Sequence, residues 1–225
     1  MTGPLLNLVF MGPPGAGKGT QAELFQQRHG IPHISTGEMF RQAVRDHTDV
    51  GARAAAYVQQ GDLVPDAIVD EMVRLRLARP DAAQGFILDG YPRTVGQAGA
   101  LDALLAARRQ GLDAVVSFEI REEVLLWRLT GRRVCPQCGA IYHLDHKPPK
   151  APGRCDLDGT ALVQRKDDAA DTVLHRLKVF RQWTAPLADH YRNRGLFLVV
   201  DAERSVEDMH ERILAFVRSR AGRGV

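Results

Sequence analysis

Two kinds of hydrophobic pattern alternate along the chain. Short apolar runs bounded by glycine, proline or polar residues predict buried strands at 5–11, 85–89, 114–120 and 196–200. Longer segments with helical spacing and recognisable ends predict helices at 18–29, 35–45, 50–60, 66–78, 94–109, 122–130, 172–191 and 205–220. Strands that alternate with helices in this way predict an α/β fold with a doubly wound parallel sheet of about five strands.

The pattern changes between Gly131 and Asp168. Four prolines lie in this segment, and neither helical nor strand spacing continues through it. Such a composition is typical of turns. The sequence therefore predicts a turn-rich subdomain at 131–168, here called the lid, inserted into a single core that extends over 1–225.

Composition excludes some classes of protein. The 225 residues are 44% hydrophobic and 25% charged, which is ordinary for a soluble globular protein. No apolar run approaches the roughly 18 residues that a membrane span needs, and we expect no membrane association. The first residues lack a basic flank, so we expect no signal peptide and a cytoplasmic protein.

Charge gives little evidence by itself. The net charge of +3 offers no argument for nucleic-acid binding. The chain has 25 arginines and 5 lysines, so a single arginine is informative only within a motif. The three cysteines all lie between positions 135 and 155, which favours a reducing compartment and a bound metal over disulfides.

A glycine-rich loop joins the first predicted strand to the first predicted helix. Glycines let the backbone approach a polyphosphate closely, and the following helix adds its positive end. A lysine supplies a full charge and a threonine a hydroxyl for Mg²⁺. The alternative, a turn without a ligand, is disfavoured by the flanking strand and helix. The residues expected to hold a triphosphate here are Gly15, Ala16, Gly17, Lys18, Gly19 and Thr20.

A metal site is predicted in the lid. Cys135 and Cys138 form a Cys-x-x-Cys pair, and Cys155 and Asp158 repeat its spacing after sixteen intervening residues. Four such ligands suit a structural Zn²⁺ with no open position. A redox pair is disfavoured by the loop context. A hydrogen-bonded lid without metal stays open, as do other fourth ligands, namely Asp156, His143 and His146.

The motifs together resemble the adenylate kinases. They are Gly-Lys-Gly-Thr at 17–20, Ser-Thr-Gly-Glu-Met-Phe-Arg at 35–41, Gly-Asp-Leu-Val-Pro-Asp at 61–66, Leu-Asp-Gly-Tyr-Pro-Arg-Thr at 88–94, Gly-Arg-Arg at 131–133, Arg-Lys-Asp-Asp at 165–168 and Thr-Ala-Pro-Leu at 184–187. The resemblance covers essentially the whole chain. The Cys/Cys/Cys/Asp pattern is similar to that of some bacterial members with a long lid.

This resemblance implies a P-loop NTPase-type core and a Mg²⁺-dependent transfer of phosphate from ATP to AMP, giving two ADP. It implies a role in adenine nucleotide homeostasis, and we expect a monomer. It also implies that a helical insertion at 35–64 forms much of an AMP site. The residues implied there are Thr36, Arg41, Asp62, Leu63, Val64, Gly90, Tyr91, Pro92, Arg93, Gln97, Arg165 and Arg176.

The chemistry of these residues agrees with that assignment. Arg41 and Arg93 suit a phosphate because a guanidinium grips two oxygens at once. Gln97 carries both the donor and the acceptor that a purine edge requires. Two plainer interpretations remain open: Thr36 caps a helix, and Gln97 lies on a solvated helix face. Tyr91 stands where the family usually has Phe.

The resemblance also implies where the transferred phosphate is stabilised. The catalytic set would be Lys18, Arg93, Arg128, Arg132, Arg165 and Arg176. Thr20 and Asp89 would hold Mg²⁺ through water, although Asp89 also fits a plain turn residue. Arg128 and Arg132 would bind ATP, and Ile141, Tyr142 and Arg204 would lie near its base, unless Tyr142 is a core residue of the lid.

Two other functions are considered. A kinase that prefers UMP, CMP or GTP would share most motifs, but Thr36 favours AMP because pyrimidine-acting relatives tend to have Ala at that place. A zinc-knuckle interaction module would bind nucleotide only as a switch. The many arginines in phosphate-directed motifs argue against that module.

Overall fold

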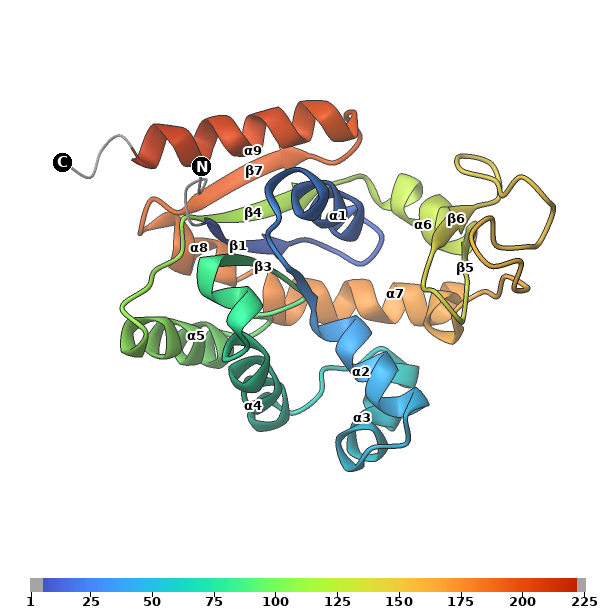
Figure 1. Cartoon of the computed structure of the whole chain (residues 1–225), viewed down its shortest axis with the longest axis horizontal. Helices are drawn as coiled ribbons and strands as arrows, with labels where there is room; N and C mark the ends of the chain where they lie inside the picture. Colours follow the sequence, from blue (N-terminus) through green and yellow to red (C-terminus); the bar gives the residue numbers. More distant parts are fainter. Residues whose placement is uncertain (1–5, 222–225) are drawn as a thin grey trace.

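Five parallel strands form the central sheet of the computed structural model, which describes residues 6–221 (Figure 1). They are β1 (Leu6–Met11), β2 (His33–Ser35), β3 (Gly85–Asp89), β4 (Ala114–Glu119) and β7 (Phe197–Asp201). The strand order is β2-β3-β1-β4-β7. Leu5, the first residue of a predicted strand, lies outside the described residues.

Both faces of this sheet are buried under helices, which explains the continuous apolar runs. Along β1, Leu8 and Phe10 face one layer, while Val9 and Met11 face the other. The first layer contains α1 (Lys18–His29) and α9 (Val206–Ala221). The second contains α4 (Asp66–Leu77), α5 (Val95–Ala107) and α8 (Leu187–Arg192). The predicted doubly wound α/β fold is confirmed.

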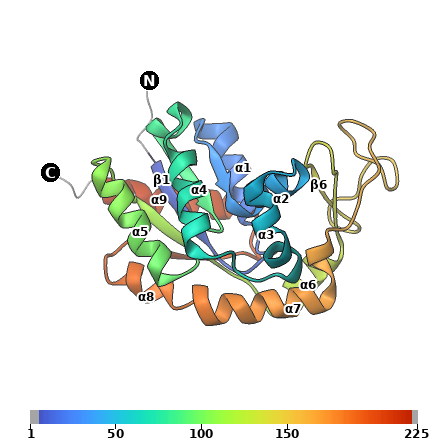
Figure 2. The ribbon, with the colours of Figure 1, turned by 90° about the horizontal axis from the view of Figure 1, so that it is seen from below.

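The helical insertion is a pair of helices, α2 (Thr36–Arg45) and α3 (Asp49–Gln60). They approach closely at Gly51, where a Cβ would lie 2.1 Å from the carbonyl oxygen of Ala43. Helix α7 (Ala170–Val179) extends from the core past this pair toward the lid (Figure 2). Other helical segments are α6 (Glu122–Thr130) and the short turns η1 (Pro80–Gln84) and η2 (Lys166–Asp168).

The lid is built on a small antiparallel hairpin of β5 (Arg132–Val134) and β6 (Ile141–His143). Val134 is also bridged to Val163, which ties the end of the lid to its beginning. The apolar cluster inside is small and contains Cys135, Tyr142 and Cys155. Strands of three residues are too short to show alternation, so the sequence pattern did not predict this hairpin or β2.

The predicted helix at 172–191 is interrupted. Helix α7 ends at Val179, the π-helical turn η3 (Phe180–Thr184) follows, and α8 begins after Pro186. Proline lacks a backbone N–H and cannot continue the helix ladder. The widened turn brings Thr184 to the site, where its hydroxyl donates to the carbonyl oxygen of Arg93 over 3.2 Å. None of the helices within 6–221 has the length and apolar character needed to cross a membrane.

Candidate active site

The glycine-rich loop lies between β1 and α1. Gly12, Gly15 and Gly17 have φ values of 144°, 84° and 91°, which other residues rarely adopt. Gly17 immediately precedes α1, and no side chain caps this helix. The first N–H groups of α1 are therefore available to an anion, and the helix dipole adds positive potential there.

Lys18 turns back over this loop. Its Nζ donates to the carbonyl oxygens of Gly12 and Pro13, each over 2.9 Å. Burial lowers the pKa of Lys18 to about 8, against the attraction of Asp89 and with the repulsion of Arg93 and nearby arginines. A phosphate bound here would relieve that repulsion and replace the carbonyl partners.

Asp89 lies at the carboxyl end of β3, beside the loop. Its Oδ2 is 3.3 Å from Nε2 of His33, which comes from the neighbouring strand β2. Burial opposes ionisation, but the His33 hydrogen bond and the charge of Lys18 hold the pKa of Asp89 below its usual value. The carboxylate is therefore ionised next to the glycine-rich loop.

A group of half-buried arginines lies near Lys18 and Asp89. Burial lowers the pKa of Arg176 to about 10, with further repulsion from Arg132 and Arg93. Burial also lowers the pKa of Arg165 to about 10, with repulsion from Arg41 and Arg132. Because these neighbouring cations repel one another, a bound polyanion would be strongly attracted to them.

Three acidic side chains hold these arginines in place. Arg132 donates from Nε to Asp168 over 2.7 Å, and Arg176 lies 3.0 Å from Asp167. Glu38 accepts from Arg41 over 3.0 Å and lies 3.6 Å from Arg165. Glu38 thus connects the helical insertion with the end of the lid.

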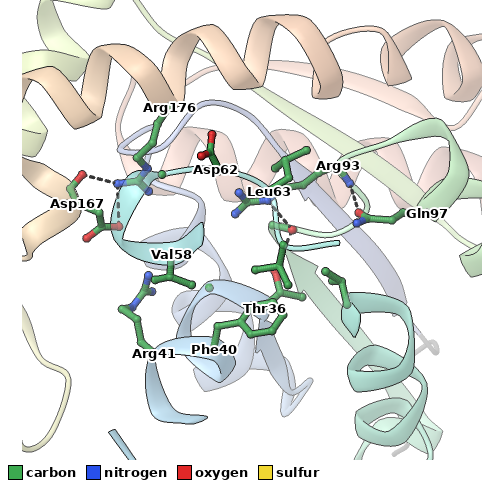
Figure 3. Close-up of a pocket in the computed structure, with 15 residues that line it drawn as sticks. Thr36, Phe40, Arg41, Val58, Asp62, Leu63, Arg93, Gln97, Asp167 and Arg176 are labelled. Carbon is green, nitrogen blue, oxygen red and sulfur yellow. Dashed lines mark hydrogen bonds and ion pairs between the residues drawn. The ribbon is translucent and has the colours of Figure 1, made fainter. Parts of the chain in front are cut away.

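A pocket opens beside the arginines (Figure 3). Its predicted lining residues are Thr36, Arg41, Asp62, Leu63, Val64, Gly90, Arg93, Gln97 and Arg176. Apolar side chains that the sequence did not single out complete the wall, namely Phe40, Val58 and Val69. Charged groups at one end and apolar walls elsewhere suit a nucleoside monophosphate.

Thr36 and Gln97 have specific roles in this wall. Ser35, not Thr36, caps α2 by accepting from the backbone N–H of Glu38, whereas the Thr36 hydroxyl donates to the carbonyl oxygen of Gly90 over 2.9 Å. Gln97 is 2% exposed, which excludes the solvated-face interpretation.

The four predicted metal ligands converge in the lid. One ligand atom each from Cys135, Cys138, Cys155 and Asp158 lies within 4.8 Å of the others. The two halves have matching turns, since Gly139 and Gly159 each donate from N–H to the carbonyl oxygen four residues earlier. Three sulfurs and one carboxylate are a suitable tetrahedral set for Zn²⁺.

Two of the other proposed fourth ligands, His143 and Asp156, have different partners. Nδ1 of His143 accepts from the backbone N–H groups of Asp145 and His146, each over 3.1 Å. Asp156 accepts from the backbone N–H of Lys150 over 2.8 Å. Among the described residues, Asp158 is the acidic or histidine side chain that joins the three cysteines.

Comparison with known proteins agrees with this geometry. The family model described as adenylate kinase matches residues 10–196. The chain belongs to the adenylate kinase family. It is an ATP:AMP phosphotransferase, which forms two ADP from ATP and AMP.

Individual relatives align along most of their length. The adenylate kinase of Moorella thermoacetica is 52% identical over 89% of this chain and 93% of its own. The adenylate kinase of Carboxydothermus hydrogenoformans is 52% identical over 91% of this chain and 95% of its own. That of Archaeoglobus fulgidus is 47% identical over 94% and 98%.

Not every residue predicted for this adenylate kinase reaches the pocket or the loop. The Tyr91 hydroxyl donates to Asp70 over 2.7 Å in the core behind the pocket. Tyr142 is buried in the lid, where its hydroxyl accepts from the backbone N–H of Asp156 over 2.7 Å. Its alternative role as a core residue of the lid fits this placement. Arg204 lies 3.6 Å from Asp201 on the surface.

Arg128 does adjoin the glycine-rich loop. One terminal nitrogen lies 3.9 Å from where a Cβ on Gly17 would stand, and another donates to the carbonyl oxygen of Ala202 over 3.0 Å. Pro92 is buried next to Arg93, and Ile141 is half-buried on the lid hairpin.

Sequence reasoning missed several polar residues of the site. His33 had no motif to identify it, and its partner Asp89 is 56 positions away. Asp167 and Asp168 stood within a family motif but carried no assigned role. Glu38 belongs to a capping pattern and to the family motif at 35–41, and neither assigns it a role in the site. The signal available for the three acids was their proximity in sequence to phosphate-directed arginines.

Proposed function

We propose that ATP binds on the glycine-rich loop and AMP in the adjacent pocket, with their phosphates meeting at one shared cationic centre. The main support for this proposal is that Arg93 and Arg176 line the pocket and also lie close enough to Lys18 to repel its charge. Two phosphate sites with common arginines are the arrangement that direct transfer between two nucleotides requires.

On the donor side, the loop from Gly15 to Thr20 would wrap the triphosphate. Lys18 would leave the carbonyl oxygens of Gly12 and Pro13 to bind phosphate oxygens, and Arg128 adjoins the same loop. Thr20 and Asp89 are the residues suited to Mg²⁺, with water between ion and carboxylate. The ion would neutralise phosphate charge.

On the acceptor side, Arg41 and Arg93 would bind the AMP phosphate. Phe40 and Val58 provide apolar surface for the nucleoside, and Gln97 offers hydrogen bonds to the base. The half-buried backbone from Asp62 to Leu63 would complete the wall.

The reaction needs charge stabilisation and alignment more than proton transfer. An AMP phosphate oxygen, already ionised, would bond to the γ-phosphorus of ATP while the bond from that phosphorus to the β–γ bridging oxygen breaks. Lys18, Arg93 and Arg176, with the lid arginines, would stabilise the spread negative charge. Asp167 and Asp168 would keep the guanidinium groups in position.

The helical insertion and the lid would exclude water from this centre. Glu38 of the insertion reaches Arg165 of the lid over 3.6 Å, and Asp62 is 2.6 Å from His175 of α7. Closure of both segments over bound nucleotides would prevent transfer to water.

The lid would be stabilised by one Zn²⁺ held by Cys135, Cys138, Cys155 and Asp158. The donor set supports this, because Cys135 Sγ already lies 3.3 Å from Asp158 and Cys138 Sγ 3.5 Å from Cys155 Sγ. Four protein ligands would leave no open position for a reacting molecule, so the metal's role is structural.

We further propose a cytoplasmic monomer. Reduced cysteines are required for the metal cluster, and a single chain supplies both the loop and the pocket. Light scattering of the purified protein across concentrations tests the monomer, since a mass that doubles as concentration rises would contradict it.

Calorimetry with a linked dinucleotide tests the two-site proposal. A molecule that joins two adenosines through a polyphosphate should bind one per chain and should compete with both ATP and AMP. Lys18→Met should weaken ATP binding far more than AMP binding. A chain that takes only one nucleotide, and does not bind the dinucleotide, would overturn the proposal.

A panel of AMP, UMP, CMP and GMP as acceptors tests the choice of base. We expect a strong preference for AMP. Faster turnover with UMP or CMP would support the pyrimidine alternative.

A further inference from the structure

The side-chain amide of Gln97 is held at both ends. Its Oε1 accepts from the backbone N–H of Arg93 over 2.7 Å, and its Nε2 donates to Oδ1 of Asp66 over 2.7 Å. Figure 3 shows the first of these bonds at the pocket wall. A buried amide with two short partners cannot turn freely.

Asp66 is itself fixed against α5. Its Oδ2 accepts from the Thr94 hydroxyl over 2.7 Å, and Thr94 in turn accepts from the backbone N–H of Gln97 over 3.1 Å. Gly96 leaves room for the carboxylate, because a Cβ there would lie 3.2 Å from Oδ2. Asp66 is also the first residue of α4, where the helix dipole favours a negative charge.

The two partners of Gln97 cannot exchange roles. A backbone N–H can only donate, and an ionised carboxylate can only accept. If the amide flipped, its NH₂ would face the N–H of Arg93 and its oxygen would face Asp66. The amide therefore keeps one orientation, and each of its two polar atoms retains capacity for one more hydrogen bond.

We propose that Asp66 is a specificity-determining residue, which makes the pocket select a 6-aminopurine over a 6-oxopurine. Adenine donates from its 6-amino group and accepts at the adjacent ring nitrogen, matching an amide fixed in one orientation. A 6-oxopurine presents an acceptor and a donor in the reverse order. The inference rests on the proposed contact between Gln97 and the AMP base.

Asp66 is not part of the pocket wall and acts through Gln97, so it is a positioning residue. Among the described residues, its carboxylate is the hydrogen-bond partner of Nε2 that opposes rotation at that end. Without it, only the N–H of Arg93 opposes a flip. Loss of a charge-assisted hydrogen bond of this kind should shift the equilibrium between the two orientations of the Gln97 amide by about tenfold or more.

The test compares AMP and inosine monophosphate as acceptors for Asp66→Ala. We expect KM for AMP to rise about tenfold and KM for inosine monophosphate to fall, while kcat with AMP changes by less than about threefold. Opposite changes in the two KM values distinguish positioning from general loosening, which would raise both.

Thr94→Val is the matched control. It removes the other hydrogen bond of the Asp66 carboxylate and the cap of α5, but leaves the bond from Gln97 to Asp66. We expect it to lower the melting temperature without changing the ratio of the two KM values. A ratio that changes as much in Thr94→Val as in Asp66→Ala would overturn the proposal.

Asp66→Asn covers the case in which the alanine variant folds poorly. Its amide has the shape of the carboxylate and can face Gln97 with either group, so selectivity should fall part of the way. An unchanged ratio in both Asp66 variants overturns the proposal.

Gln97→Leu tests the contact with the base separately from the role of Asp66. If it leaves KM for AMP unchanged, the proposed contact with the base is wrong. If it raises that KM while Asp66→Ala and Asp66→Asn have no effect on selectivity, only the role of Asp66 is wrong.

Discussion

Arg132 and Asp168 form a two-pronged ion pair that joins the beginning of the lid to its end. Arg132 donates from Nε to Oδ2 of Asp168 over 2.7 Å, and from Nη2 to Oδ1. Asp168 is fully buried, and its Oδ1 also lies 3.5 Å from Arg176. One carboxylate thus orients two of the arginines proposed to act on the transferred phosphate.

Replacing Asp168 with Asn should therefore damage both activity and stability. The amide keeps the shape of the carboxylate, but Arg132 loses its counter-charge and Arg176 keeps Asp167. Breaking a buried pair in this way costs about 3–5 kcal/mol. We expect urea unfolding to show a loss of that order. We also expect kcat/KM to fall by roughly a hundredfold, because the guanidinium groups lose their orientation.

Asp171→Asn is the control, since it removes the same charge from an exposed position on α7. It should change stability by less than about 0.5 kcal/mol. Equal effects from the two variants would show that Asp168 contributes only to net charge.

The elements and the residues of the site were not equally predictable from sequence. The strand β1, the glycine loop and Lys18 are adjacent along the chain, so one motif with flanking patterns identifies them together. The pocket residues Arg41, Arg93 and Gln97 come from separate segments, and only the family resemblance linked them.

Side chains that act through other side chains were missed. Asp66 meets Gln97, and His33 meets Asp89, only after β2, β3, α4 and α5 have packed. The π-helical turn that carries Thr184 to Arg93 depends on the position of Pro186 and on tertiary contacts, so periodicity predicted a continuous helix there. Local pattern does not encode such pairings.

Binding of ATP should take up a proton above pH 8. The pKa of Lys18 is about 8 because the side chain is buried among arginines, and a bound triphosphate would raise it. At pH 8.5 the free protein holds only part of this proton, so binding should absorb roughly 0.7 proton. Calorimetry in buffers of different ionisation enthalpy measures this uptake.

Lys18→Met is the control for that experiment, and it also tests the pKa through stability. The folded protein holds the Lys18 proton less tightly than the unfolded chain, so burial of the charge is unfavourable below pH 8. This penalty should fade as pH rises from about 8 to 10.5. The stability gained on substitution should shrink over the same range. A binding enthalpy independent of buffer would contradict the depressed pKa.

Metal removal should act on the lid before it acts on the core. The lid buries only a small apolar cluster, so a structural Zn²⁺ would supply much of its stability. We expect one zinc per chain by elemental analysis, and a lower melting temperature after chelation. Asp158→Ala should lose most of the metal.

Asp156→Ala is the matched variant, two residues away and outside the ligand cluster. It should retain zinc at the normal stoichiometry. Equal zinc loss in both variants would mean that Asp158 is not a ligand, and a protein purified without zinc would remove the proposed role altogether.

Arg93 should show a conflict between activity and stability. Burial lowers the pKa of Arg93, and Arg41 adds repulsion, so its charge is unfavourable in the folded protein without nucleotide. Its Nε donates to the carbonyl oxygen of Gly90 over 2.8 Å, which offsets only part of this. Arg93→Met fills similar space without charge. It should lower kcat/KM by at least about a thousandfold, while the melting temperature stays equal or rises.

Arg93→Ala should remove most activity with a normal circular dichroism spectrum, and Arg93→Lys separates charge from geometry. Lysine keeps the cation but cannot grip two phosphate oxygens in one plane, so its activity should lie between those of the wild type and Arg93→Met. Near-normal turnover in the methionine variant would show that Arg93 does not stabilise the transferred phosphate. A large drop in the melting temperature of Arg93→Met would contradict the expected conflict. It would show that the hydrogen bond from Arg93 to Gly90 stabilises the fold by more than the buried charge destabilises it.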